Sequence, residues 1–188
     1  EGTLGVVTRA TLKLQPLPRF HALMLVPFKS VTNACRTVSE IFIAGDIPSA
    51  LEFMERDAMV LTQEFTGNKN LSIDPSDQAY LLIEVDGFDA SEIMPQCERI
   101  LSVLEENGAG EVLFGQSEAE KERLWFLRRR VAEAVKATSV YKEEDTVVPR
   151  GMLPDLMLAV KSLGKKYGFR SICYGHAGDG NLHINILR

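Results

Sequence analysis

Short apolar segments alternate with longer amphipathic segments along the whole sequence, and this alternation restricts the chain to a mixed fold. Residues 79–85 (AYLLIEV) are the clearest candidate for a strand. Residues 91–107 predict a helix with one apolar stripe, and Gly108 is placed to end it. The chain has no dinucleotide-binding glycine fingerprint. We therefore expect an α+β fold, with a mostly antiparallel sheet, helices on one face and a duplicated ferredoxin-like arrangement.

The other elements are predicted by the same patterns and by local end signals. Ser30 is suited to cap a helix that runs to about Ala44, and Ser117 with Glu120 forms a possible capping box. Prolines at positions 16 and 18 indicate a linker. Further strands are expected at residues 10–14, 21–28, 51–55, 111–114 and 146–148 and from residue 171 onward, and further helices from residue 55 toward 65, at 117–136 and at 152–167.

The composition argues against several classes of function. A net charge of −5 offers no broad basic field, so we expect no nucleic-acid partner. No apolar run approaches the ~20 residues of a membrane-spanning helix. The cysteines Cys35, Cys97 and Cys173 are widely separated and odd in number, which suggests buried, reduced thiols and a cytoplasmic location.

Both ends of the chain suggest a piece of a longer protein. The sequence begins at Glu1 without a methionine or a polar leader, and it enters an apolar pattern at once. Residues 185–188 stop within an alternating pattern that is typical of a strand. We therefore expect a fragment that is cut at both ends.

The segment 174–185 (YGHAGDGNLHIN) contains most of the chemistry-bearing residues. Asp179-Gly180 is a preferred dipeptide for a two-residue hairpin turn, because both central positions need a positive φ. Such a turn would place His176 opposite His183, with Cβ atoms about 5 Å apart on one face. Two imidazoles in that arrangement could chelate one cation.

The face shared by these histidines has a second polar member. Asn185 follows His183 by two residues and therefore lies on the same face of the strand, whereas Ile184 and Ile186 point to the other face. A pair of histidines is nevertheless often incidental, and a catalytic zinc usually has three protein ligands. No third ligand is evident nearby, so the spacing alone leaves metal binding open.

Four segments of the chain resemble one family. The segment GHAGDGNLHINI resembles the C-terminal motif of the flavin-linked oxidases that include D-lactate dehydrogenases, glycolate oxidase flavin subunits and D-2-hydroxyglutarate dehydrogenases. Residues 1–18 (EGTLGVVTRATLKLQPLP) resemble the end of their FAD-binding domain, which is of the vanillyl-alcohol-oxidase type. Residues 124–128 resemble their W-x-x-R element, and residues 145–150 their D-x-x-x-P-R element. The four motifs occur in the order of the family.

The resemblance assigns roles to residues on the substrate side. It implies that His176 and His183 bind a divalent metal, Zn or Mn, with a glutamate beyond this chain as the third ligand. It implies that Arg128 holds the substrate carboxylate and that Asn185 lines the substrate pocket. A bidentate guanidinium suits that task. Without the resemblance, Arg128 would be interpreted as a solvated charge in a run of three arginines.

The resemblance also divides the chain. Residues 1–18 would be the tail end of the FAD-binding domain and a linker, and residues 19–188 the C-terminal substrate or cap domain, truncated at its C-terminus. The residues Glu1, Gly2, Thr3 and Gly5 would belong to a loop that passes close to the FAD, where small residues let the backbone approach a cofactor.

Two positions depart from the pattern of the D-2-hydroxyglutarate dehydrogenases. Ala132 stands where these enzymes carry a threonine, and Glu143 stands where they carry a lysine. An acidic side chain there would repel a second substrate carboxylate. We therefore expect a monocarboxylate such as lactate or glycolate.

The implied activity belongs to the intact parent protein. It is the oxidation of a small 2-hydroxy acid, by hydride transfer from C2 to N5 of FAD with a divalent metal, and the catalytic base is expected beyond Arg188. The expected partners are the FAD-binding domain of the same protein and a second copy in a homodimer. The isolated fragment is expected to be folded, colourless and inactive. The alternatives are a metal- or small-molecule-binding module without a redox role, and a ferredoxin-like regulatory domain.

Overall fold

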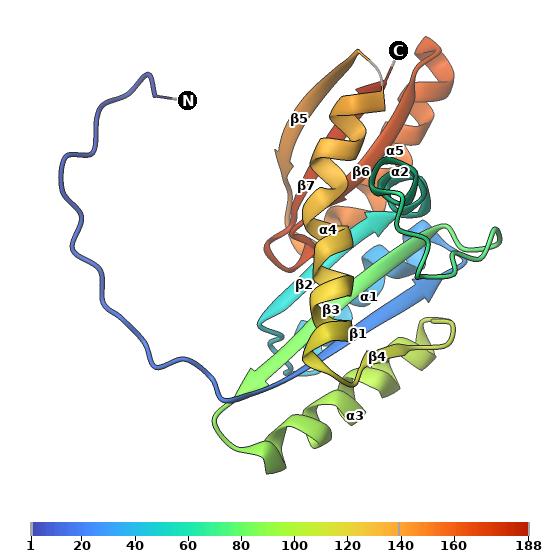
Figure 1. Cartoon of the computed structure of the whole chain (residues 1–188). Helices are drawn as coiled ribbons and strands as arrows, with labels where there is room; N and C mark the ends of the chain where they lie inside the picture. The colour runs from blue at the N-terminus through green and yellow to red at the C-terminus, as the bar shows by residue number, and fades with distance from the viewer. Residues whose placement is uncertain (1, 139, 188) are drawn as a thin grey trace.

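The computed structural model describes residues 2–138 and 140–187. Its elements are β1 (Phe20–Phe28), α1 (Val31–Ile43), β2 (Ala50–Glu55), α2 (Arg56–Thr66), β3 (Ala79–Gly87), α3 (Ala90–Glu106), β4 (Leu113–Gly115), α4 (Glu118–Thr138), β5 (Tyr141–Val147), the 3-10 turn η1 (Arg150–Met152), α5 (Leu153–Tyr167), β6 (Arg170–Gly175), the 3-10 turn η2 (Ala177–Asp179) and β7 (Asn181–Leu187). Together the strands form one sheet (Figure 1). No helix among the described residues is long and apolar enough to cross a bilayer.

The strand order shows two related halves. The sheet runs β4-β1-β3-β2-β6-β7-β5, and every neighbouring pair is antiparallel. The first four strands have the order of a ferredoxin-like unit, with α1 and α3 as its crossover helices and α2 inserted between β2 and β3. In the second half, β5, α5, β6 and β7 repeat the β-α-β-β part of that unit in the same relative order. The predicted α+β class, antiparallel sheet and duplication are confirmed.

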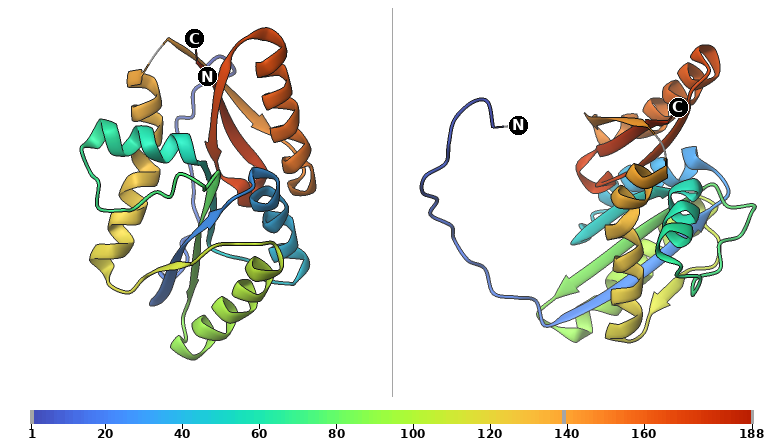
Figure 2. Two further views of the ribbon diagram at one scale, coloured as in Figure 1. Left: turned by 90° about the vertical axis from the view of Figure 1, so that its right-hand side faces the viewer. Right: turned by 45° about the horizontal axis from the view of Figure 1, so that its top comes forward.

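The helices cover both faces of the sheet, so the prediction of helices on one face is wrong. One face packs against α1, α3 and α5, and the opposite face packs against α2 and α4 (Figure 2, left). Along β3, Leu81 and Ile83 point to the first face, while Tyr80 and Leu82 point to the second. A strand that is buried on both faces has a continuous apolar sequence rather than an alternating one, which is what residues 79–83 show.

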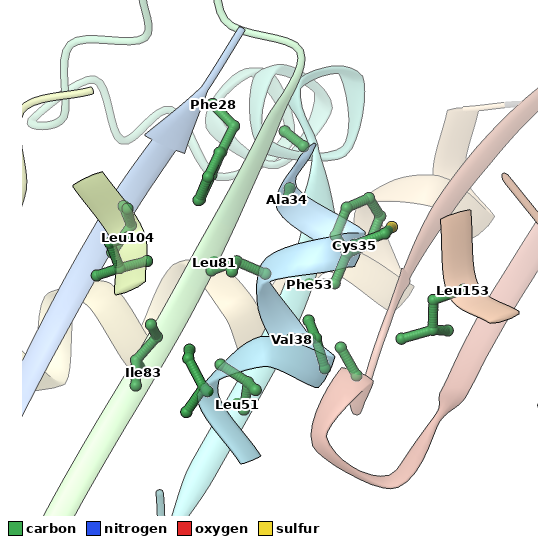
Figure 3. Close-up of a cluster of buried hydrophobic side chains, with 14 of the residues drawn as sticks. Phe28, Ala34, Cys35, Val38, Leu51, Phe53, Leu81, Ile83, Leu104 and Leu153 are labelled. Carbon is green, nitrogen blue, oxygen red and sulfur yellow. The ribbon is translucent and has the colours of Figure 1, made fainter. Parts of the chain in front are cut away.

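The larger core lies on the face of α1, α3 and α5. In Figure 3, side chains from both sheet and helices meet there, among them Phe53, Leu81 and Val38. Burying a side chain of this size contributes about 1.5–3 kcal/mol relative to its exposed state. The three cysteines are free and buried, as predicted, and burial raises the pKa of the Cys35 thiol to about 12. The thiols therefore act as small apolar core residues.

The predicted helix starts are confirmed. The backbone N–H of Asn33 donates to the Ser30 hydroxyl at 3.2 Å. At the start of α4, Glu120 N–H donates to the Ser117 hydroxyl at 3.3 Å, while Ser117 N–H donates to the Glu120 carboxylate at 3.0 Å. These reciprocal bonds are a complete capping box.

The segment before β1 differs from the prediction. Residues 2–18 form no helix or strand, although a strand was expected at 10–14, and Figure 1 shows the segment running away from the body of the fold. Its alternating apolar side chains, such as Leu12 and Leu14, are almost fully exposed. A strand needs a neighbour to satisfy its backbone groups, and the described residues supply none at this point. The alternation therefore produces no strand within this chain.

Candidate functional site

The hairpin between β6 and β7 does not have the predicted register. His183 stands opposite Tyr174, not opposite His176. A two-residue turn would require positive φ at both Asp179 and Gly180, and of these two only Gly180 has it, at +73°. The loop instead forms the 3-10 turn η2, closed by Asn181 N–H donating to His176 O at 3.1 Å.

The two histidines still come together. The register differs by two residues, and a shift by two keeps each side chain on its predicted face. The ring centroids of His176 and His183 lie 6.2 Å apart, with the ring planes inclined at 73°. Both rings lie on the face of the sheet that carries α4, outside the apolar interior. The predicted pair of imidazoles is therefore available for one ligand.

Each of these imidazoles contacts a carboxylate through the same ring atom. His176 Nδ1 lies 2.7 Å from a Glu52 carboxylate oxygen, and His183 Nδ1 lies 2.9 Å from a Glu143 carboxylate oxygen. A carboxylate at Nδ1 leaves Nε2 for a ligand, which is the usual arrangement of metal-binding histidines. Within residues 2–138 and 140–187, no three His, Cys, Asp or Glu side chains are placed to hold a metal ion. These two histidines thus fit a metal as a source of two nitrogen ligands.

Arg128 is buried against the sheet, unlike its neighbours in the arginine run. Its Nη2 and Nε lie 2.7 and 2.9 Å from one Glu52 oxygen, and the Tyr174 ring centroid lies 5.4 Å from its Cζ. By contrast, the side chain of Arg129 is 58% exposed. The interpretation of Arg128 as a solvated charge is therefore wrong. Glu52 occupies the Nε edge of the guanidinium, which leaves its Nη1 end for a further anion.

Asn185 is fully buried on the same face as His183. Neither polar atom of its side chain has a hydrogen-bond partner of good geometry. The nearby Tyr174 hydroxyl has a pKa raised by burial and by the charge of Glu143, against a lowering contribution from the Asn185 amide. A buried amide whose hydrogen bonds are incomplete costs about 1–3 kcal/mol, so its presence here is consistent with a ligand that completes them.

Glu143 has a contact that the sequence did not predict. Besides His183, the carboxylate of Glu143 faces Lys136 at 3.8 Å. The side chain therefore places negative charge beside an imidazole as well as near the pocket, while no well-aligned hydrogen bond joins it to His183 Nδ1. Its effect on substrate choice stays a prediction, as does that of Ala132, which packs against the core under α4.

Sequence reasoning missed Glu52 and Tyr174. A signal for Glu52 was present, because this charged residue stands within the otherwise apolar segment ALEFM of a buried strand. Such a side chain must be paired. Its partners, however, lie 76 and 124 residues away along the chain. A local sequence pattern cannot predict contacts between residues so far apart in the sequence.

The residues predicted to approach the flavin lie apart from this cluster. Gly2, Thr3 and Gly5 are exposed in the extended N-terminal segment (Figure 1), and Glu1 lies outside the described residues. Their role stays a prediction.

A cavity of about 330 Å³ lies next to His176, and Glu52, Arg150 and Asp179 contribute to its lining.

The tight loop beside His176 gives a test of this geometry. Gly180 and Gly168 both have φ of +73°, but an added Cβ at Gly180 would collide with the backbone oxygen of Val148, whereas one at Gly168 would meet no atom within 4 Å. We expect Gly168→Ala to cost about 1–2 kcal/mol of unfolding free energy, and Gly180→Ala roughly 1–3 kcal/mol more. Urea unfolding of the two variants measures the difference. Equal losses would contradict the close packing of this loop.

Comparison with known proteins identifies relatives along the whole chain. The family model of the FAD linked oxidases, C-terminal domain, matches residues 17–188. A D-lactate dehydrogenase of Anaerostipes hadrus is 35% identical over 98% of this chain and 40% of its own length. The glycolate oxidase subunit GlcD of Escherichia coli (strain K12) is 36% identical over 100% of this chain and 37% of its own length. The chain thus spans about two fifths of these relatives.

Solved structures share the fold at low sequence identity. An alkyldihydroxyacetonephosphate synthase matches 98% of this chain and 38% of its own, with a TM-score of 0.67 and 15% identity. A 4-ethylphenol oxidase from Gulosibacter chungangensis matches 94% of this chain and 40% of its own, with a TM-score of 0.55 and 10% identity. At such identities the likeness concerns the fold alone.

Proposed function

The chain belongs to the FAD-linked oxidases as their C-terminal domain, and on that premise we propose that it forms the substrate side of a flavin-dependent dehydrogenase for small 2-hydroxy acids. The relatives named D-lactate dehydrogenase and glycolate oxidase subunit support a substrate of the D-lactate or glycolate type. The remainder of the protein would supply most of the FAD site.

One observation carries the proposal. Two imidazoles, a buried guanidinium and a buried amide with incomplete hydrogen bonds gather on the α4 face of the sheet, from His176, His183, Arg128 and Asn185. A cation and an anion can be bound side by side there, and a 2-hydroxy acid offers its hydroxyl to the cation and its carboxylate to the guanidinium. This combination distinguishes a 2-hydroxy acid from a simple alcohol or amine.

Each residue then has a defined task. Arg128 binds the substrate carboxylate with its Nη1 end and so fixes the orientation of C2. His176 and His183 donate Nε2 to a divalent cation, and the Asn185 amide faces the bound substrate. When bound, FAD would supply the hydride acceptor for C2, and the cation held by the two imidazoles would supply a Lewis acid for the substrate hydroxyl. Because both imidazoles serve as ligands, we expect the base that takes the hydroxyl proton to come from the rest of the protein.

The acidic environment favours a single substrate carboxylate. Glu143 and Asp145 both lie beside His183, with Asp145 at 3.7 Å from Nδ1. A second carboxylate directed at this side would meet like charge. The proposed order of preference is therefore lactate or glycolate above a dicarboxylate.

The full-length protein tests the proposal directly. We expect turnover of D-lactate or glycolate in a panel of D- and L-2-hydroxy acids assayed with a dye as electron acceptor, loss of turnover after treatment with a chelator, and recovery on adding Zn²⁺ or Mn²⁺. A protein that oxidises no 2-hydroxy acid would refute the proposed substrate class. Turnover that resists metal removal would refute the proposed role of His176 and His183.

A further inference from the structure

Glu52 lies between the two parts of the proposed site. Its buried carboxylate belongs to β2, in the first half of the fold, while Arg128 belongs to α4 and His176 follows β6 in the second half. One carboxylate oxygen lies 2.7 Å from His176 Nδ1, and the other lies 2.7 Å from Arg128 Nη2 and 2.9 Å from its Nε. A single side chain thus contacts both the imidazole and the guanidinium.

We propose that Glu52 is a positioning residue, which sets the ligand atom that His176 presents to a cation and the edge that Arg128 presents to a carboxylate. The proposal rests on the proposed function of these two residues. Glu52 would touch neither substrate nor cation itself. It would act through the residues that do.

The contact with His176 determines the tautomer of the ring. An ionised carboxylate only accepts hydrogen bonds, so Nδ1 must carry the proton and Nε2 the lone pair. A neutral imidazole binds metals through such a lone pair, and a carboxylate at the other nitrogen makes it a better donor. Without Glu52, the ring would be free to rotate and to place its proton on either nitrogen.

The contact with Arg128 determines the direction of the guanidinium. One Glu52 oxygen holds the Nε and Nη2 side of the planar group, so the Nη1 end points away from the sheet strand that carries Glu52. Nη2 is buried and forms no well-aligned hydrogen bond. A substrate carboxylate at the Nη1 and Nη2 end would accept the hydrogen bond that Nη2 lacks.

A second buried glutamate of β2 shows what an ordinary structural pair looks like. Glu55 binds Lys161 of α5 at 2.7 Å and accepts a hydrogen bond from the backbone N–H of Cys173. It contacts no imidazole, and its lysine partner is 39% exposed. Glu52, in contrast, holds two residues of the proposed site.

The test compares two glutamate variants in the full-length protein. Glu52→Gln keeps the shape of the side chain but removes its charge. Glu84→Gln is the matched control, because Glu84 also contacts the Nδ1 atom of a histidine, His21, at 3.1 Å, but outside the proposed site. We expect Glu52→Gln to raise the dissociation constant for Zn²⁺ by about 10–100-fold and to raise KM for the hydroxy acid. Glu84→Gln should leave both unchanged.

The outcomes separate this proposal from the function on which it rests. Zn²⁺ affinity, measured by competition with a chromophoric chelator, needs no turnover. If the unchanged protein binds Zn²⁺ and oxidises hydroxy acids while Glu52→Gln behaves like Glu84→Gln, the role of Glu52 is overturned and the function stands. If the unchanged protein does neither, both fall.

A charge-conserving variant covers the case in which Glu52→Gln does not fold. Glu52→Asp retains the carboxylate but shortens its reach by one methylene. We expect its Zn²⁺ affinity and its KM to lie between those of the unchanged protein and those expected for Glu52→Gln. Zn²⁺ affinity and KM identical to those of the unchanged protein would overturn the proposal, because a positioning role depends on reach.

Discussion

Replacing Arg128 by methionine is expected to lower kcat/KM for the hydroxy acid by about 10²–10³-fold and to reduce the unfolding free energy by about 3–5 kcal/mol. The first effect arises because the substrate carboxylate loses its cation. The second arises because the Glu52 carboxylate stays buried after losing the guanidinium, with only its contact to His176 left. Steady-state kinetics of the full-length protein and urea unfolding measure the two effects separately.

Two further variants complete this experiment. Arg129→Met removes an exposed arginine of the same helix, and we expect a change within about 0.5 kcal/mol and an unaltered kcat/KM. The double variant Arg128→Met/Glu52→Leu replaces the buried pair by apolar groups, which is often neutral for stability. We expect it to recover stability but no activity. If Arg128→Met behaved like Arg129→Met, a substrate-binding role for Arg128 would be untenable.

Alanine at both His176 and His183 should abolish metal binding and all turnover that a chelator can remove. Loss of an outer-shell partner alone costs about 10–100-fold in metal affinity, and here two of the proposed ligands are lost together. Metal content by atomic emission and chelator-sensitive activity are the measurements. The third histidine of the chain provides the control, because His21 contacts Glu84 and Glu118 outside the site. The variant His21→Ala should therefore retain the metal content and the chelator-sensitive activity of the unchanged protein. A double variant that retains both metal and chelator sensitivity would contradict the assignment.

The predictions from sequence succeeded where the signal was local. The caps at Ser30 and Ser117 depend on residues three positions away, and both are confirmed. The face shared by His183 and Asn185 depends only on the alternation of a strand, so it survived an error of two residues in the register of the hairpin. Because side chains alternate between the two faces of a strand, a register shift by two residues leaves each side chain on its predicted face.

The predictions failed where distant segments decide the outcome. The sequence of β3 is apolar at successive positions from Ala79 to Ile83, but that pattern alone does not tell which helices cover each side. Glu52 could be marked as an unusual strand residue, yet its partners follow from the pairing of β2 with β6 and from the position of α4. Contacts of this kind depend on topology rather than on neighbouring residues.

The join between the two halves of the sheet has a consequence for how damage to this protein should be diagnosed. Strands β2 and β6 share only the pairs Phe53–Gly175 and Met54–Tyr174, and Glu52 with His176 lies directly beyond them. A small rotation about this short seam would part the carboxylate from the imidazole, and it would also disturb the core on the α1 face, to which Phe53 of one half and Leu182 of the other both belong. Damage at the join should therefore lower ligand affinity and thermal stability together, whereas a defect confined to the loop after β6 should lower ligand affinity alone.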